Sequence, residues 1–158
     1  MAVILLADDS DDDVFLIRRT LQTANIINPL RVVHDGEQAL AYLKGEPPYH
    51  DREAYPLPEL LLLDLKMPRV DGFQVLAWLR QQPEWRKLPV AVLTSSTDVR
   101  DANAAFALGA NSFLIKPMDF MRFAEFAQAM AGSWLWVSQV PANGAPPASV
   151  CAAEVIAA

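Results

Sequence analysis

The feature that most constrains the fold is a run of four consecutive leucines, Leu60–Leu63, which ends in Asp64. A short and continuously apolar segment is typical of a strand that is buried on both faces, as in a parallel sheet. The residues that follow include Met67-Pro68 and Asp71-Gly72, a composition typical of a loop. In open α/β sheets, sites form at the carboxyl ends of the strands. We therefore expect Asp64 to lie where chemistry can take place.

Short apolar segments alternate with amphipathic segments along most of the chain, which predicts five β-α units. Strands are expected over Val3–Ala7, Leu30–His34, Glu59–Leu63, Pro89–Leu93 and Ser112–Ile115. Helices are expected over Asp11–Ala24, Glu37–Lys44, Gly72–Gln82, Val99–Leu108 and Asp119–Trp136. Parallel β-α-β units form a doubly wound sheet with helices on both faces, so the expected fold is α/β of the (βα)5 type. We assign residues 1–136 to this domain and residues 137–158 to an Ala- and Pro-rich tail.

The composition excludes several classes of protein. Hydrophobic residues make up 53% of the 158 residues, which is enough for one packed core. The formal net charge of −6 disfavours nonspecific binding to nucleic acid, which depends on Lys and Arg. No apolar run approaches the roughly 20 residues of a membrane span, and the N-terminus lacks the pattern of a signal peptide. The one cysteine, Cys151, excludes an internal disulfide and is typical of a cytoplasmic protein.

The first predicted helix begins with a cluster of acids. Ser10 is expected to cap it, and we interpret Asp11, Asp12 and Asp13 as residues that favour a helix N-terminus rather than as site residues. The apolar positions of this helix are Val14, Leu16, Ile17 and Leu21. Asp71 is interpreted in the same structural way, as a residue that helps Gly72 to start the third helix.

Polar side chains follow four of the five predicted strands. They are Asp8 and Asp9 after the first strand, Asp64 after the third, Thr94–Ser96 after the fourth, and Lys116 after the fifth. Because the carboxyl ends of parallel strands meet at one edge of a sheet, we expect these side chains to converge. Clustered carboxylates repel one another unless a cation binds between them, and a small set of hard oxygen ligands with room for water suits Mg²⁺. A carboxylate beside such a metal, with a lysine and a hydroxyl opposite, could attack phosphorus in line, so the pattern predicts an aspartyl-phosphate site.

These motifs resemble the receiver domains of two-component response regulators, over roughly Val3 to Gly132. The resemblance is carried by ADDS, LLLLDLKMPRVDGFQVL, VLTSS and GANSFLIKP, which occur in the family's order at successive strand ends. It is greatest to the stand-alone regulators that are paired with bacterial and cyanobacterial phytochromes. The shared features are a Pro-rich loop before the third strand, the LKMPRVDG loop, and a last helix that ends in Trp and Leu. The resemblance implies a flavodoxin-like fold with strand order 2-1-3-4-5.

The resemblance also implies roles in phosphoryl transfer. Asp64 would accept the phosphoryl group and Lys116 would pair with it. Thr94 would donate a hydrogen bond to it, with the backbone N–H of Ser95 nearby. Thr94 and Phe113 would form a switch that moves on activation. Because Phe113 has no hydroxyl, where the family often has tyrosine, the switch would act through packing.

A metal site is implied by the same resemblance. Asp9 and Asp64 would bind Mg²⁺ directly, Asp8 would bind it through water, and Lys66 would bind it through its backbone carbonyl. The peptide bond between Lys116 and Pro117 is expected to be cis, as is usual in the family.

Two kinds of protein partner follow. The phosphoryl donor would be a sensor histidine kinase, and the similarity points to a bacterial phytochrome. The last predicted helix has a second apolar face, which favours a homodimer over simple cover by the tail. This dimer would use the segments 99–108, 112–115 and 119–136, with Phe113, Met121, Phe126 and Trp136 on its surface.

Two other functions are open to such a sequence. A phosphatase of the haloacid-dehalogenase type also uses an Asp nucleophile, Mg²⁺, Thr and Lys. That class needs a second acid two residues after the nucleophile, where this chain has Lys66. A phosphorylation-independent binding module, or pseudo-receiver, usually lacks one of the site residues, and this chain has all of them.

Overall fold

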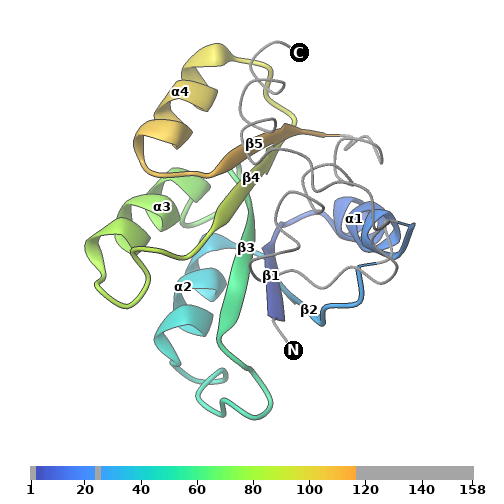
Figure 1. The fold of residues 1–158 in the computed structure, drawn as a ribbon, viewed down its shortest axis with the longest axis vertical. Coiled ribbons are helices and arrows are strands. Elements are labelled where there is room, and N and C mark those ends of the chain that lie inside the picture. The colour runs from blue at the N-terminus through green and yellow to red at the C-terminus, as the bar shows by residue number, and fades with distance from the viewer. Residues whose placement is uncertain (1–2, 24–25, 117–158) are drawn as a thin grey trace, which may run out of the picture.

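The computed structural model describes residues 3–23 and 26–116, which form a five-stranded parallel sheet flanked by helices (Figure 1). The strands are β1 (Val3–Ala7), β2 (Leu30–Val33), β3 (Pro58–Asp64), β4 (Val90–Thr94) and β5 (Ser112–Ile115). The helices are α1 (Asp11–Thr23), α2 (Gly36–Lys44), α3 (Gly72–Gln81) and α4 (Val99–Ala107). The strand order is β2-β1-β3-β4-β5 and all the pairs are parallel, so the predicted topology is confirmed.

Several predictions fall outside the described residues. They concern the helix over Asp119–Trp136, the tail of residues 137–158, the peptide bond to Pro117, the dimer residues Met121, Phe126 and Trp136, and Cys151. No helix in the described part of the chain is both long enough and apolar enough to cross a membrane.

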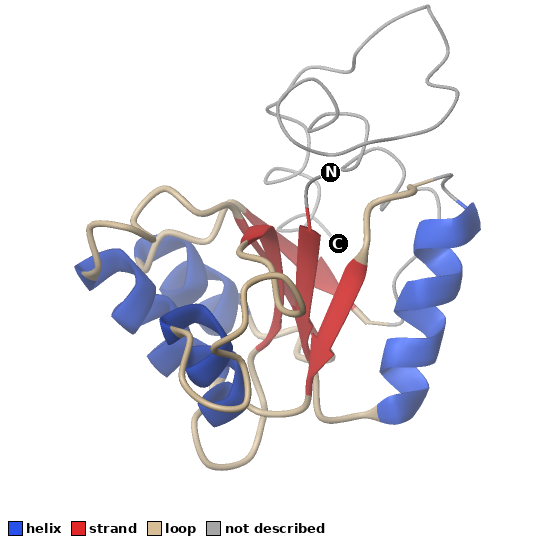
Figure 2. Cartoon of the chain, turned by 90° about the horizontal axis from the view of Figure 1, so that it is seen from below, coloured by secondary structure: helices blue, strands red, loops and turns tan. Residues whose placement is uncertain are grey.

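The sheet is covered by helices on its two faces. Helix α1 lies on one face, and α2, α3 and α4 lie on the other (Figure 2). Leu60 to Leu63 in β3 are each at most 1% exposed. Successive side chains of a strand point to opposite faces, so this run of leucines is packed from both sides. The prediction of a strand buried on both faces is thus confirmed, and β3 forms the rigid centre of the molecule.

Two strand ends lie one residue later than predicted. We expected the third and fourth strands to stop at Leu63 and Leu93, whereas β3 ends at Asp64 and β4 at Thr94. The pairing continues through Asp64 opposite Leu93 and Thr94 opposite Ile115. Both polar side chains therefore project from rigid strand backbone rather than from a loop, which fixes their positions more firmly.

Helix α1 is amphipathic, as predicted, but its buried stripe is narrower. Val14, Ile17 and Leu21 are buried at spacings of three and four residues. Leu16, which is apolar as well, is not part of this stripe and is 49% exposed. Leu16 lies one position before Ile17, about 100° away around the helix. The hydroxyl oxygen of Ser10 accepts a hydrogen bond from the Asp13 N–H at 3.3 Å, as expected for a cap.

The long segment 45–57 between α2 and β3 is held to the end of α2 by one arginine. The Arg52 guanidinium donates hydrogen bonds to the carbonyls of Tyr42 and Leu43 at 2.8 and 2.9 Å. These are carbonyls of the last turn, where the regular bonds of the helix end, and the Tyr42 carbonyl also accepts from the capping Gly45 N–H at 3.2 Å. The Tyr42 hydroxyl donates to the Pro56 carbonyl at 2.7 Å. The segment is therefore a fixed part of the fold, although its sequence predicts only a surface loop.

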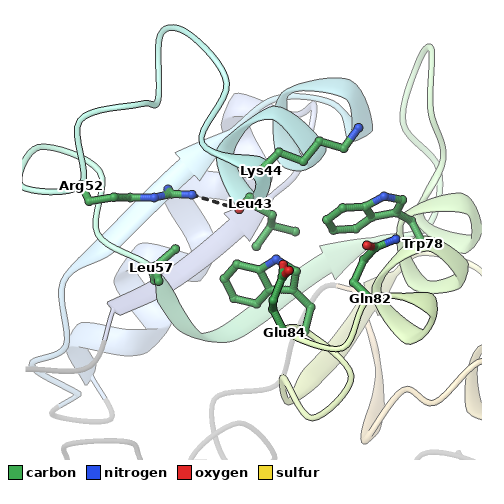
Figure 3. Close-up of a pocket in the computed structure, with 8 residues that line it drawn as sticks. Leu43, Lys44, Arg52, Leu57, Trp78, Gln82 and Glu84 are labelled. Atoms are coloured by element: carbon green, nitrogen blue, oxygen red, sulfur yellow. Dashed lines mark hydrogen bonds between the residues drawn. The ribbon is translucent and has the colours of Figure 1, made fainter.

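A hollow lies beside this segment, between α2 and α3 (Figure 3). It has a volume of about 550 Å³ and is lined by Leu43, Lys44, Arg52, Leu57, Trp78, Gln82, Glu84 and Trp85. The Lys44 ammonium lies 5.5 Å from the ring centroid of Trp78. The lining residues belong to the ends of α2 and α3 and to the loops that lead into β3 and β4. The hollow is therefore at the opposite end of the sheet from the carboxyl ends of the strands.

Candidate functional site

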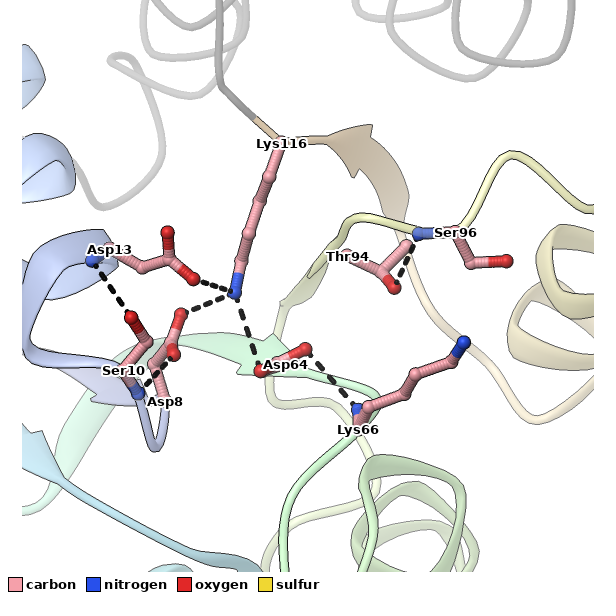
Figure 4. Close-up of polar contacts among 8 residues, drawn as sticks. All are labelled: Asp8, Ser10, Asp13, Asp64, Lys66, Thr94, Ser96 and Lys116. Carbon is pink, nitrogen blue, oxygen red and sulfur yellow. Dashed lines mark hydrogen bonds and ion pairs between the residues drawn. The ribbon is translucent and has the colours of Figure 1, made fainter.

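The carboxyl ends of four strands bring the predicted polar residues together (Figure 4). Asp8 follows β1 directly, Asp64 and Thr94 are the last residues of β3 and β4, and Lys116 follows β5. Asp8 and Thr94 are 0% exposed and Asp64 is 6% exposed. The predicted convergence of these side chains at one edge of the sheet is therefore observed.

Lys116 is the centre of this group. Its Nζ lies 2.6 Å from Oδ2 of Asp8, 2.9 Å from Oδ2 of Asp13 and 3.3 Å from Oδ2 of Asp64. Burial of the ammonium acts to lower the pKa of Lys116, but its hydrogen bonds to Asp8 and Asp13 outweigh this and raise that pKa above its usual value. Lys116 is therefore a permanent positive charge that is shared among three carboxylates.

Asp13 is a member of the group that sequence reasoning missed. We interpreted it as one of three acids that favour the start of α1, yet its carboxylate contacts Lys116. Side chains on a helix lean toward its N-terminus, and Asp13 in the first turn therefore leans back over the end of β1. The run of acids in the sequence carries no signal that separates Asp13 from Asp11 and Asp12. Asp11 and Asp12 are exposed, which fits the interpretation we gave them.

Three carboxylates form a group that fits a divalent metal ion. Asp8, Asp9 and Asp64 each offer one oxygen, and these oxygens all lie within 4.8 Å of one another. Asp9 is exposed while the other two are buried, so the group is open to solvent on one side. A small set of hard oxygen donors with access to water is the ligand environment that Mg²⁺ and Mn²⁺ favour. An acidic triad of this kind is typical of metal-binding receivers.

The Asp64 carboxyl is electrostatically unusual. Burial raises its pKa to about 6, the nearby Lys116 opposes this rise, and the charge on Asp8 adds to it. Its Oδ1 accepts a hydrogen bond from the Lys66 N–H at 3.2 Å. The Lys66 N–H is thus directed at the Asp64 carboxylate, while the metal-ligand role of the Lys66 carbonyl stays a prediction. The Asp64 carboxylate is poorly solvated and close to one cation, which is the environment of a reactive group.

The β4 end supplies hydroxyl groups to the same edge. The Thr94 hydroxyl oxygen accepts a hydrogen bond from the Ser96 N–H at 3.2 Å. The Ser96 hydroxyl in turn donates to Asp101 of α4 at 2.6 Å. Ser95 is exposed beside them. These bonds connect the predicted phosphoryl-binding hydroxyl to the first turn of α4.

Phe113, the predicted packing switch, lies in the core. Its ring is 2% exposed, and its centroid lies 6.4 Å from that of Phe106 in α4. The expectation that Phe113 contributes to an exposed dimer surface does not fit this burial. Phe113 remains compatible with a switch, because its ring lies against Phe106 of α4. The Ser96 hydroxyl contacts the same helix through Asp101.

The loop after Asp64 returns to the site through Gly72. A Cβ at Gly72 would lie 2.4 Å from the backbone oxygen of Asp64, so only glycine allows this approach. Asp71 caps α3 by accepting from the Gln74 N–H, and the Gln74 side chain accepts from the Asp71 N–H. The structural role predicted for Asp71 is confirmed.

Comparison with known proteins gives a consistent result. The family model of the response regulator receiver domain matches residues 4–128. The response regulator Rcp1 of Synechocystis sp. is 36% identical over 140 residues, which cover 89% of this chain and 93% of Rcp1. The crystal structure of the Mn²⁺-bound form of Rcp1 matches with a TM-score of 0.71 and covers 90% of this chain and 100% of that chain.

Two further solved structures are similar. One is the response regulator RPA3017 in red light signaling of R. palustris, at 34% identity and a TM-score of 0.75, covering 89% of this chain and 99% of that chain. The other is the phosphorylated cyanobacterial phytochrome response regulator RcpA, at 29% identity and a TM-score of 0.70, covering 84% and 93%. The chain therefore belongs to the family of response regulator receiver domains, which are phosphoacceptor signalling proteins.

Proposed function

We propose that this receiver accepts a phosphoryl group on Asp64 from a sensor histidine kinase. The observation that carries the proposal is the position of the Asp64 carboxylate, 3.3 Å from the Lys116 ammonium and within a group of three carboxylates. Asp64 is the member of this group that ends the central strand, and Thr94 ends the neighbouring strand. An attacking carboxylate and the groups that bind the transferred phosphoryl oxygens are thus supplied by one edge of the sheet.

In the proposed reaction, an Oδ of Asp64 attacks phosphorus in line and the N–P bond of the donor phosphohistidine breaks. The products are an acyl phosphate on Asp64 and a histidine that regains its proton. Lys116 pairs with the phosphoryl oxygens, and the Thr94 hydroxyl donates a hydrogen bond to one of them. A movement of the Thr94 hydroxyl toward the phosphoryl group would disturb its bond to Ser96 and hence the start of α4.

Mg²⁺ is the metal that we propose for this site. Asp9, Asp64 and the Lys66 carbonyl would hold it, with Asp8 bound through water. When bound, the metal supplies positive charge against the oxygens of the transferred phosphoryl group. The support is the oxygen donor set of Asp8, Asp9 and Asp64, together with the Mn²⁺-bound form of the relative Rcp1.

We further propose that the kinase is of the phytochrome type and that signalling takes place in the cytoplasm. Several relatives are named as phytochrome or red-light response regulators. The receiver would span residues 1–136, with residues 137–158 as a tail. Two copies would associate through α4, β5 and the segment 119–136, using Met121, Phe126 and Trp136. The exposure of Val99 at the start of α4 supports an apolar surface there.

The test is phosphotransfer from autophosphorylated histidine kinases, including a bacterial phytochrome kinase, onto wild-type protein and Asp64→Asn. We expect label to reach the wild type and not the variant, with faster transfer from the phytochrome kinase than from an unrelated one. Equal labelling of Asp64→Asn would refute the acceptor assignment. Sedimentation of the same samples would test the dimer, and a monomer at micromolar concentration would refute it.

The residue at position 66 distinguishes the proposed phosphoacceptor from a phosphatase. A phosphatase with an Asp nucleophile needs a second acid two residues later, and Lys66 occupies that position next to Asp64. With p-nitrophenyl phosphate and Mg²⁺, we expect no sustained turnover. Continuous release of nitrophenolate by wild type, lost in Asp64→Asn, would favour the phosphatase.

A further inference from the structure

The acceptor loop, which we define as residues 65–71 between β3 and α3, contains a strained turn. Arg69 has a positive φ of 67°, and it is the only residue other than glycine with a positive φ in the described part of the chain. The Val70 N–H donates to the Pro68 carbonyl at 2.9 Å, so Arg69 is the central residue of a three-residue turn. A positive φ is unfavourable for arginine, whereas glycine adopts it freely. The surrounding structure must therefore hold it in place.

The Arg69 side chain provides one such restraint. Its guanidinium forms an ion pair and hydrogen bond with Asp35, and its Nε lies 3.8 Å from a Glu37 oxygen. The burial of the two partners is unequal, because the Asp35 side chain is 4% exposed and that of Arg69 is 63% exposed. Asp35 also caps α2 by accepting from the Gln38 N–H at 2.7 Å. A buried carboxylate requires compensation of its charge, and Arg69 supplies it from the loop.

Close packing provides a second restraint beside the first. A Cβ at Gly36 would lie 2.0 Å from the carbonyl oxygen of Val70, so the loop backbone lies directly on the start of α2. At its other end the loop is joined to the site, where the Lys66 N–H donates to Asp64 at 3.2 Å. The loop therefore connects the capped start of α2 to the backbone next to the acceptor carboxylate.

We propose that Arg69 is a positioning residue, and that its ion pair with Asp35 holds the acceptor loop in the strained turn that keeps the Lys66 carbonyl available to a divalent cation at Asp9 and Asp64. This inference rests on the proposed function, because it presumes the metal site. It adds that the affinity of the site depends on an ion pair whose members do not touch the metal.

Calorimetric titration of the full chain with Mg²⁺, without a phosphoryl donor, tests this inference. Arg69→Ala removes the ion pair but keeps the backbone strain, so we expect its affinity for Mg²⁺ to fall by about tenfold, the size expected for one strained residue. Arg69→Gly removes the ion pair and the strain together, so a smaller fall of about threefold is expected. Loss of a positive charge near the acidic group would by itself tighten Mg²⁺ binding. If the Arg69 variants bind Mg²⁺ more weakly than wild type, the cause is therefore a displaced acceptor loop and not the lost charge.

The matched control is Arg100→Ala. Arg100 also pairs with a helix-capping aspartate, Asp98 before α4, but Asp98 is far less buried than Asp35, and the Arg100 side chain is 90% exposed. The Arg100→Ala variant loses one positive charge, as Arg69→Ala does. We expect its Mg²⁺ affinity to be unchanged or slightly higher than that of wild type. A double-mutant cycle with Asp35→Asn adds a second test, because asparagine can still cap α2. The double variant Asp35→Asn/Arg69→Ala should bind Mg²⁺ about as well as Arg69→Ala alone.

The possible results are distinguishable. Wild-type affinity in Arg69→Ala or in Arg69→Gly, with folding confirmed by circular dichroism, would overturn the inference, and so would independent losses in the double-mutant cycle. Asp64→Asn should abolish binding in every background. If wild type and Asp64→Asn bind Mg²⁺ equally, the metal site itself is wrong and the proposed function fails with it. If Asp64→Asn loses binding while the Arg69 variants do not, only the positioning role is refuted.

Discussion

At the scale of single residues, the site is a balance between buried carboxylates and one lysine. Asp8 and Asp64 are almost fully buried, and Lys116 is the cation that contacts both. Burial of a charge is costly unless the charge is paired, so the buried carboxylates lower the stability of the fold and Lys116 offsets part of that cost. The next two predictions measure the cost of the Asp64 carboxylate and the contribution of the Lys116 ammonium.

Asp64 should destabilise the fold when it is ionised. Its pKa of about 6 is higher than in the unfolded chain, so the folded protein binds more protons between about pH 4 and pH 6, and the free energy of unfolding falls as the pH rises through this window. In a chelator at neutral pH, Asp64→Asn should therefore be more stable than wild type by about 1–3 kcal/mol. Chemical denaturation at several pH values measures this difference, which should vanish near pH 4. A variant that is less stable than wild type at neutral pH would contradict the argument.

Lys116→Met should have the opposite effect. It leaves the carboxylates of Asp8, Asp13 and Asp64 without their cation, and removal of one partner from a buried ion pair lowers the free energy of unfolding by about 3–5 kcal/mol. Denaturation in a chelator measures the loss, and added Mg²⁺ should restore part of it. Lys87→Met, at an exposed position, is the matched control and should change stability little.

Prediction from sequence was most successful for the residues at strand ends. Asp8, Asp64, Thr94 and Lys116 could be placed together because parallel strands bring their carboxyl ends to one edge. Asp13 could not, since its contact depends on the direction in which a side chain leans from the first turn of a helix. The Arg69 turn could not be predicted either, because nothing in arginine's own preferences favours a positive φ.

At the scale of elements, the segments that connect the helices and strands are also held by specific contacts. Element types and order were predictable from periodicity, and only their ends differed, for example where pairing with the next strand extended β3 and β4 by one residue. The segment before β3 was predicted only as a Pro-rich loop. Its attachment depends on Arg52, which lies eight residues beyond the end of α2 and therefore outside any local helix pattern.

Arg52→Ala should loosen this segment and the last turn of α2. It leaves the carbonyls of Tyr42 and Leu43 without the guanidinium, and we expect the free energy of unfolding to fall by about 1–3 kcal/mol. Arg52→Lys keeps the charge but not the fork of donors, so it should recover less than half of that loss. Hydrogen exchange should show faster exchange in residues 45–57. Full recovery in Arg52→Lys would indicate that charge alone holds the segment.

At the scale of the whole molecule, the acidic edge should make stability depend on divalent cations. The unfolded chain does not bring Asp8, Asp9 and Asp64 together, so a cation that binds them stabilises only the folded state. Mg²⁺ at about 100 times its Kd should raise the free energy of unfolding by about 2.7 kcal/mol. Thermal unfolding with and without chelator measures this, and Asp9→Asn should reduce the effect. An equal gain in Asp64→Asn would place the cation elsewhere.

The central claim is that Asp64 is the phosphoacceptor, and intact-mass spectrometry after incubation with acetyl phosphate and Mg²⁺ tests it most directly. We expect one phosphoryl adduct on wild-type protein, lost when Mg²⁺ is chelated, and no adduct on Asp64→Asn. The Arg100→Ala protein should be modified like wild type. An unmodified wild type in the presence of Mg²⁺, or an adduct of equal abundance on Asp64→Asn, would contradict the account.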